Sequence, residues 1–110
     1  MKFVQLKKSN DGKTKYEMVF LDTEKDKLKS VKFGANGYND YTIYNKITTK
    51  EEADKYKENY IKRHSKTEDW TNPIKKGTLS RYILWNQTTI EDSLKDYLSR
   101  FPELKVNLKK

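Results

Sequence analysis

The sequence KYEMVFL at residues 15–21 decides how the first half of this chain folds. Tyr16, Met18 and Phe20 share one face, because successive side chains of an extended strand point to opposite sides. Val19, with the leucine two positions after it, falls on the other face. Apolar side chains on both faces are typical of a central strand, so the stretch predicts a neighbouring strand on each side.

Turn-forming residues separate this strand from further extended segments. The turn SNDGK at residues 9–13 comes before it, and Asn, Asp and Gly tolerate the positive φ that such turns require. Residues 2–8 therefore form the preceding strand. A polar connector at residues 22–27 leads to a third strand at residues 28–33, and a fourth short strand is predicted at residues 41–44.

The second half of the chain carries helical signals. Two capping boxes, in which a threonine is followed three residues later by a glutamate, mark helix starts at Thr49 and Thr88. Between Ala53 and His64 the apolar residues recur at helical spacing on one stripe. A shorter helix is predicted before Thr88, and Pro102 ends the last one.

These signals predict an α+β fold with a single domain over residues 1–110. A small antiparallel meander at about residues 2–44 is packed by two or three helices. We expect the helices at about residues 49–65, 78–86 and 88–101. The alternating residues 104–108 are compatible with a short terminal strand.

The composition favours binding over catalysis. The chain has 24 Lys and Arg against 16 Asp and Glu, a net charge of +8, with eight Tyr, one His and no Cys. The lack of Cys excludes disulfides and thiolate metal sites, and we expect no metal and no cofactor. No apolar run is long enough to span a membrane. The positive charge fits an anionic partner, or it reflects the codon bias of an AT-rich genome.

The first candidate binding site is the pair Lys75 and Lys76, which precede Gly77 and Thr78 at a predicted helix start. Free backbone N–H groups, the helix dipole and two ammonium groups could hold a phosphate there. Arg81, one turn later, could join them. The alternative is a turn with a threonine cap and solvated lysines.

The second candidate is the basic cluster of Lys62, Arg63 and Lys66, which ends the first long helix. Beside Tyr60 and Trp70, it could grip a nucleic-acid backbone while the aromatic rings stack on bases. The alternative is helix stability, because cations in a last turn and glutamates in a first turn both suit the helix dipole.

A candidate protein interface follows the glycines of residues 34–37. Tyr38, Tyr41 and Tyr44, together with Trp70, could form an exposed aromatic face. In that case Tyr38, Tyr41 and Trp70 lie partly exposed on an isolated monomer. The equally favoured alternative is that these tyrosines complete a thin core.

An enzyme is the third and least favoured class, and we expect no catalytic residue. It would require His64, Arg63 or Arg81, and Glu68 or Asp69 to converge in one cleft. The sequence gives no sign of a nucleophile held against the histidine side chain, and a histidine at a helix end is more often structural.

Short motifs over residues 32–101 resemble a small protein family of nucleocytoplasmic large DNA viruses, the giant viruses. They include KFGANGYNDYT, RHSKTEDWT and GTLSRYILWN. The resemblance implies a viral origin, with a location in the virion or in the host cytoplasm at a viral factory. It assigns no catalytic residue.

Two functions follow from these features. The favoured one is a non-enzymatic virion component, a minor capsid or cement-like protein that binds other viral structural proteins. The alternative is a small basic protein that binds the backbone of DNA or RNA in genome packaging, transcription or replication.

Overall fold

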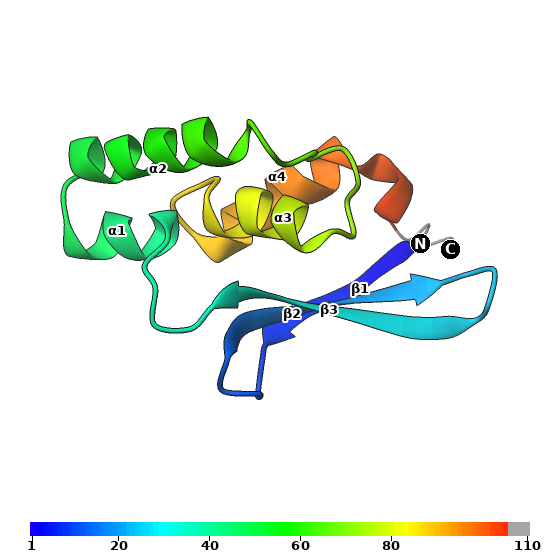
Figure 1. Cartoon of the computed structure of the whole chain (residues 1–110). Coiled ribbons are helices and arrows are strands. Elements are labelled where there is room, and N and C mark those ends of the chain that lie inside the picture. The colour runs from blue at the N-terminus through cyan, green and yellow to red at the C-terminus, as the bar shows by residue number, and fades with distance from the viewer. Residues whose placement is uncertain (106–110) are drawn as a thin grey trace.

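The computed structural model describes residues 1–105 and has an α+β fold built on a three-stranded antiparallel sheet. The strands are β1 (Lys2–Lys8), β2 (Thr14–Asp22) and β3 (Lys27–Ala35), and β2 lies between the other two. Figure 1 shows the sheet as one layer with the helices on one side of it. The predicted meander and its central strand are therefore confirmed.

Helical segments make up the rest of the described chain. They are α1 (Tyr41–Ile47), α2 (Lys50–His64), α3 (Lys76–Leu79), the π-helix η1 (Ser80–Leu84), α4 (Ile90–Arg100) and the 3₁₀-helix η2 (Pro102–Leu104). The three predicted helices are present, and the middle one begins slightly earlier than expected, at Lys76. It continues into the π turn, which closes where the Trp85 N–H donates to the Ser80 carbonyl at 3.1 Å.

The hydrophobic core lies between the sheet and the layer formed by α3, η1 and α4. From the sheet, Met18 and Phe20 are fully buried. Tyr97 of α4 is also fully buried, and its hydroxyl donates to the Pro73 carbonyl at 2.7 Å. This bond fastens α4 to the loop before α3, so the amphipathic face of α4 serves the core as its sequence predicts.

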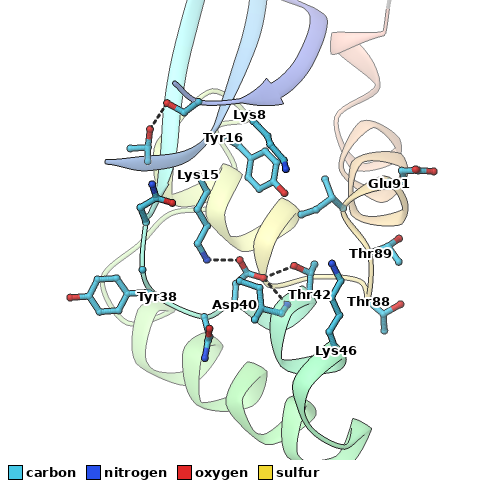
Figure 2. A pocket seen from close by; sticks show the side chains of 17 residues that line it. Lys8, Lys15, Tyr16, Tyr38, Asp40, Thr42, Lys46, Thr88, Thr89 and Glu91 are labelled. Carbon is cyan, nitrogen blue, oxygen red and sulfur yellow. Dashed lines mark hydrogen bonds and ion pairs between the residues drawn. The ribbon is translucent and has the colours of Figure 1, made fainter. Parts of the chain in front are cut away.

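The predicted fourth strand at residues 41–44 is wrong, because this segment begins α1. Asp40 caps that helix, and its Oδ1 accepts from the Ile43 N–H at 3.2 Å and from the Thr42 hydroxyl at 2.5 Å. Its Oδ2 accepts from Lys15 Nζ at 2.6 Å (Figure 2). The aromatic and β-branched residues favour a strand locally, but a capped helix start and a buried ion pair override that preference.

The two predicted helix caps have different outcomes. Thr49 caps α2, and its hydroxyl accepts from the Glu52 N–H at 3.2 Å, as predicted. The cap of α4 is Thr89, which accepts from the Asp92 N–H at 3.1 Å, so the prediction of Thr88 is wrong by one residue. Both threonines have an acidic residue three positions later, so the local sequence does not choose between them.

The predicted terminal strand at residues 104–108 lies mostly outside the described residues. Within them, Leu104 is the buried last residue of η2 rather than the start of a strand.

Candidate functional site

A cleft of about 690 Å³ lies between α2 and the chain that runs from α3 into η1. The loop at residues 38–40 and the end of β3 also contribute to its walls. The lining combines aromatic rings, exposed cations and a histidine that is paired with a carboxylate. We call it the aromatic cleft.

A continuous series of rings lines the aromatic cleft. Tyr56 of α2 stacks on Tyr44 of α1 with ring centroids 3.9 Å apart and an interplanar angle of 3°. Tyr44 lies 6.2 Å from Trp85, which stacks on Tyr60 at 4.5 Å and 6°. Tyr60 in turn lies 4.3 Å from the His64 ring. This aromatic row joins α1, α2 and the residue after η1, so it fixes the shape of the cleft.

The rings of the aromatic row differ in how far they face solvent. Tyr60 is buried, and burial together with the nearby Glu68 charge raises its pKa above the ordinary value, so its hydroxyl stays protonated. Tyr56 has 44% of its surface exposed. Tyr60 therefore acts in packing, whereas Tyr56 presents ring surface that a ligand can cover.

Arg63 and Lys76 bring positive charge to the aromatic cleft from opposite walls, α2 and α3. Both are exposed, and among residues 1–105 neither forms an ion pair. Lys15 also lines the cleft, but its charge is balanced by Asp40. The two exposed cations are therefore available to an anionic ligand.

Glu68 organises the end of the aromatic cleft near α3. Its Oε2 lies 2.6 Å from His64 Nδ1, and its Oε1 accepts from the Trp70 indole N–H at 3.0 Å. A Cβ atom built on Gly77 would lie 2.5 Å from Glu68 Oε1, so the carboxylate occupies the space that a larger residue would fill. Because residue 77 is a glycine, the carboxylate has room to contact both the His64 ring and the Trp70 indole N–H.

The three kinds of residue that an enzyme would require do share one cleft, with Arg63 in place of Arg81. Arg63, His64 and Glu68 line the same cleft, and the histidine is within hydrogen-bond distance of the carboxylate. Arg81 does not join them: its guanidinium lies 5.5 Å from the Trp70 ring and donates to the Trp85 carbonyl at 2.6 Å. Arg81 is therefore engaged in internal packing.

The remaining predicted cations lie around the aromatic cleft. Lys75 lines a smaller hollow of about 260 Å³ that also includes Glu68 and Asp69. Lys62 in the last turn of α2 and Lys66 in the following turn are exposed and do not contribute to the lining of the aromatic cleft. Of the six predicted basic residues, the structure brings Arg63 and Lys76 together there.

The four aromatic residues of the predicted interface differ in how far they are exposed. Tyr38 is 73% exposed, Trp70 is half-buried and Tyr44 belongs to the aromatic row. The prediction that Tyr41 is partly exposed is wrong, because it is only 3% exposed. As the first residue of α1 it turns inward, where its hydroxyl donates to Asp54 Oδ1 at 2.6 Å.

The sequence did not identify Tyr56 and Trp85 as candidate site residues. Tyr56 belongs to the apolar stripe of α2 and Trp85 to the apolar positions of the next helix, so both were expected in the core. The stripe does place Tyr56, Tyr60 and His64 on one side of α2, which is the signal that could have revealed the row.

Comparisons with protein families, with curated proteins and with solved structures gave no match to this chain. Within residues 1–105, no three His, Asp or Glu side chains are grouped so that they could hold a metal ion. Over the same residues, no helix is both long and apolar enough to cross a membrane.

Proposed function

We propose that this protein binds single-stranded nucleic acid in the aromatic cleft. A base packs against the exposed ring surface of Tyr56, and the flanking phosphates contact Arg63 and Lys76. The observation that carries this proposal is that two cations with no ion pair among residues 1–105 share one cleft with aromatic rings. Aromatic stacking with a positively charged groove is the usual combination in proteins that bind single strands.

The placement of the rings favours a single strand over a duplex. Duplex readers insert a helix or a β-ribbon into a groove and contact base edges. Here the rings line a cleft, and a base can reach them only when it is unpaired and turned out of its stack. The cleft volume of about 690 Å³ also falls in the range of about 300–1,000 Å³ that suits small ligands, which is the scale of one or two nucleotides.

The net charge of +8 supports the same proposal, because it raises the association rate with polyanions at low salt. The resemblance to a family of large DNA viruses would place this binding in a viral factory or in the virion, during genome packaging, transcription or replication. The role proposed here is binding without catalysis.

Fluorescence anisotropy with a labelled oligothymidylate at several salt concentrations tests the proposal. The double variant Arg63→Gln/Lys76→Gln removes two phosphate contacts, so the slope of log affinity against log salt becomes shallower by about 1.4. The control Lys62→Gln/Lys66→Gln removes the same charge from the same part of the chain but outside the cleft, and should leave the slope nearly unchanged. Equal effects of the two double variants would show that only net charge matters.

The stacking contribution has its own matched pair of variants. Tyr56→Ala should weaken binding by about 5- to 150-fold, which corresponds to about 1–3 kcal/mol for one stacked base. Tyr56→Phe keeps the ring and should bind like the wild type. If Tyr56→Ala bound with wild-type affinity, stacking of a base on Tyr56 would be refuted.

A second candidate function, a non-enzymatic virion component, is favoured by the outer face of the sheet. Among residues 1–105 no helix covers this face (Figure 1), and the register places Val19, Leu21 and Leu28 on it. Leu28 is 67% exposed, whereas Val19 is buried, and two lysines of this face, Lys7 and Lys32, are paired with Glu17 and Asp11 at 4.0 and 3.8 Å. An exposed leucine among balanced charges fits an apolar patch on another viral structural protein.

Particle incorporation separates the two functions. Leu28→Glu should lower the amount of tagged protein in particles purified from infected cells, and it should leave oligonucleotide affinity unchanged. The charge-matched substitution Thr23→Glu changes an exposed residue of the β2–β3 turn and should have little effect on incorporation. Normal incorporation of Leu28→Glu would refute the outer face as the binding surface.

A further inference from the structure

A second cleft of about 640 Å³ shares lining residues with the aromatic cleft, and Figure 2 shows the side chains around it. We call it the lysine cleft, because Lys8 at the end of β1 and Lys46 in α1 contribute to its lining. The start of β2 and the residues that begin α4, including Thr88, complete its walls. The lysine cleft thus draws on parts of the chain that are distant in sequence.

The two clefts share a wall. Lys15, Tyr38, Asn39 and Asp40 line both of them. Within that wall the Lys15 and Asp40 side chains are 11% and 3% exposed, and they form an ion pair of 2.6 Å. The two charges neutralise each other, and the cap that Asp40 provides to α1 holds the pair in place. The wall is therefore fixed and nearly neutral, so it presents little barrier to an anionic chain that crosses it.

Tyr38 lies in the wall that the two clefts share, at the junction between them. It is 73% exposed, and in Figure 2 its ring points away from the other labelled side chains. Gly37 before it has a φ of +88°, a backbone conformation that favours glycine, so the loop turns at this point and leaves the next residue at the surface. An exposed ring between two clefts is well placed to stack on a base.

The unpaired cations lie on both sides of the junction. Within residues 1–105, Lys8 and Lys46 form no ion pair in the lysine cleft, just as Arg63 and Lys76 form none in the aromatic cleft. Phosphates of one strand could thus be neutralised before and after the base at Tyr38.

From this arrangement we infer that the two clefts form one continuous track for an extended single strand, which passes over Tyr38. This inference rests on the proposed binding of single-stranded nucleic acid, and it adds the path and the second contact region. It predicts that short oligonucleotides fill the aromatic cleft alone, whereas longer ones also reach the lysine cleft.

Binding of oligothymidylates of three and twelve nucleotides to the full chain tests the track. The twelve-nucleotide strand should bind more tightly, and Lys8→Gln/Lys46→Gln should make its salt slope shallower by about 1.4 while leaving the three-nucleotide slope unchanged. The control Lys27→Gln/Lys29→Gln removes equal charge at the start of β3, a part of the strand that contributes to neither cleft, and should change neither slope. Tyr38→Ala should weaken binding of the long strand by about 5- to 150-fold, and Tyr38→Phe should not.

The possible outcomes separate the track from the proposed function. If both strands bind equally and only Arg63→Gln/Lys76→Gln weakens them, the track is refuted and the aromatic cleft remains as a binding site. If no oligonucleotide binds to protein whose thermal unfolding is normal, both are refuted. If only the long strand responds to Tyr38→Ala and to Lys8→Gln/Lys46→Gln, the track is supported.

Discussion

The substitution Gly77→Ala tests whether the Glu68 carboxylate lies where the structure places it. Alanine normally stabilises a helix relative to glycine, by at most about 1 kcal/mol. At this position, however, the new Cβ would lie 2.5 Å from Glu68 Oε1 and 3.2 Å from Glu68 Cδ. The carboxylate must move away, and its hydrogen bonds to His64 and Trp70 must lengthen or break.

The expected magnitude follows from these two opposing effects. A typical hydrogen bond contributes about 0.5–1.5 kcal/mol to stability, so the loss of two costs about 1–3 kcal/mol. Subtracting the helix gain of about 1 kcal/mol leaves Gly77→Ala destabilising by about 0–2 kcal/mol. In a Glu68→Ala background the clash is gone, so the same substitution should be neutral or stabilising by up to about 1 kcal/mol. The coupling between the two positions is therefore about 1–3 kcal/mol.

Urea unfolding of the wild type, both single variants and the double variant measures this coupling. Thermal unfolding is a second readout, in which 1 kcal/mol corresponds to about 4 °C for a chain of this size. The decisive quantity is the difference between the Gly77→Ala effects in the two backgrounds. Equal stabilisation by Gly77→Ala in both backgrounds would refute the contact with the carboxylate.

Three further predictions concern the fold and the chemistry of the site. Gly34→Ala should lower the free energy of unfolding, measured in urea, by about 2–5 kcal/mol, because the glycine has a φ of +80° and the new Cβ would lie 2.7 Å from Leu84 Cδ1. The control Gly12→Ala, where φ is also positive but no atom of residues 1–105 lies near the new Cβ, should lower it by only about 1–2 kcal/mol. Hydrogen bonds from the Thr14 and Lys13 backbone N–H groups lower the pKa of Asp11 below its ordinary value of 3.8. The charged carboxylate therefore stabilises the fold above that pH, and this stability is lost as the pH falls. In urea unfolding at a series of acid pH values, Asp11→Asn should lose less stability than the wild type as the pH is lowered. A labelled oligonucleotide should stay intact with the wild-type protein and magnesium, and cleavage that His64→Gln abolishes would contradict a non-catalytic role.

Much of the fold could be predicted from the sequence, because the relevant signals are local. The alternating residues of β2 and the turn at residues 9–13 determine the meander through side-chain period and backbone preference. The cap at Thr49 and the apolar face of α4 determine two helices in the same way. Each of these signals lies within one element or the turn beside it, so no distant contact is needed to interpret it.

The tertiary structure decided the features that depend on distant residues. Residues 41–44 have a local preference for a strand, and they form a helix because Asp40 caps it while pairing with Lys15, 25 positions earlier. The aromatic cleft likewise requires α1, α2 and the residue after η1 to meet. The sequence by itself determined the strands, most of the helices and the surplus of positive charge. Only packing between distant segments decided which aromatic rings and which cations share a cleft, because ring stacking and charge pairing depend on distance in space.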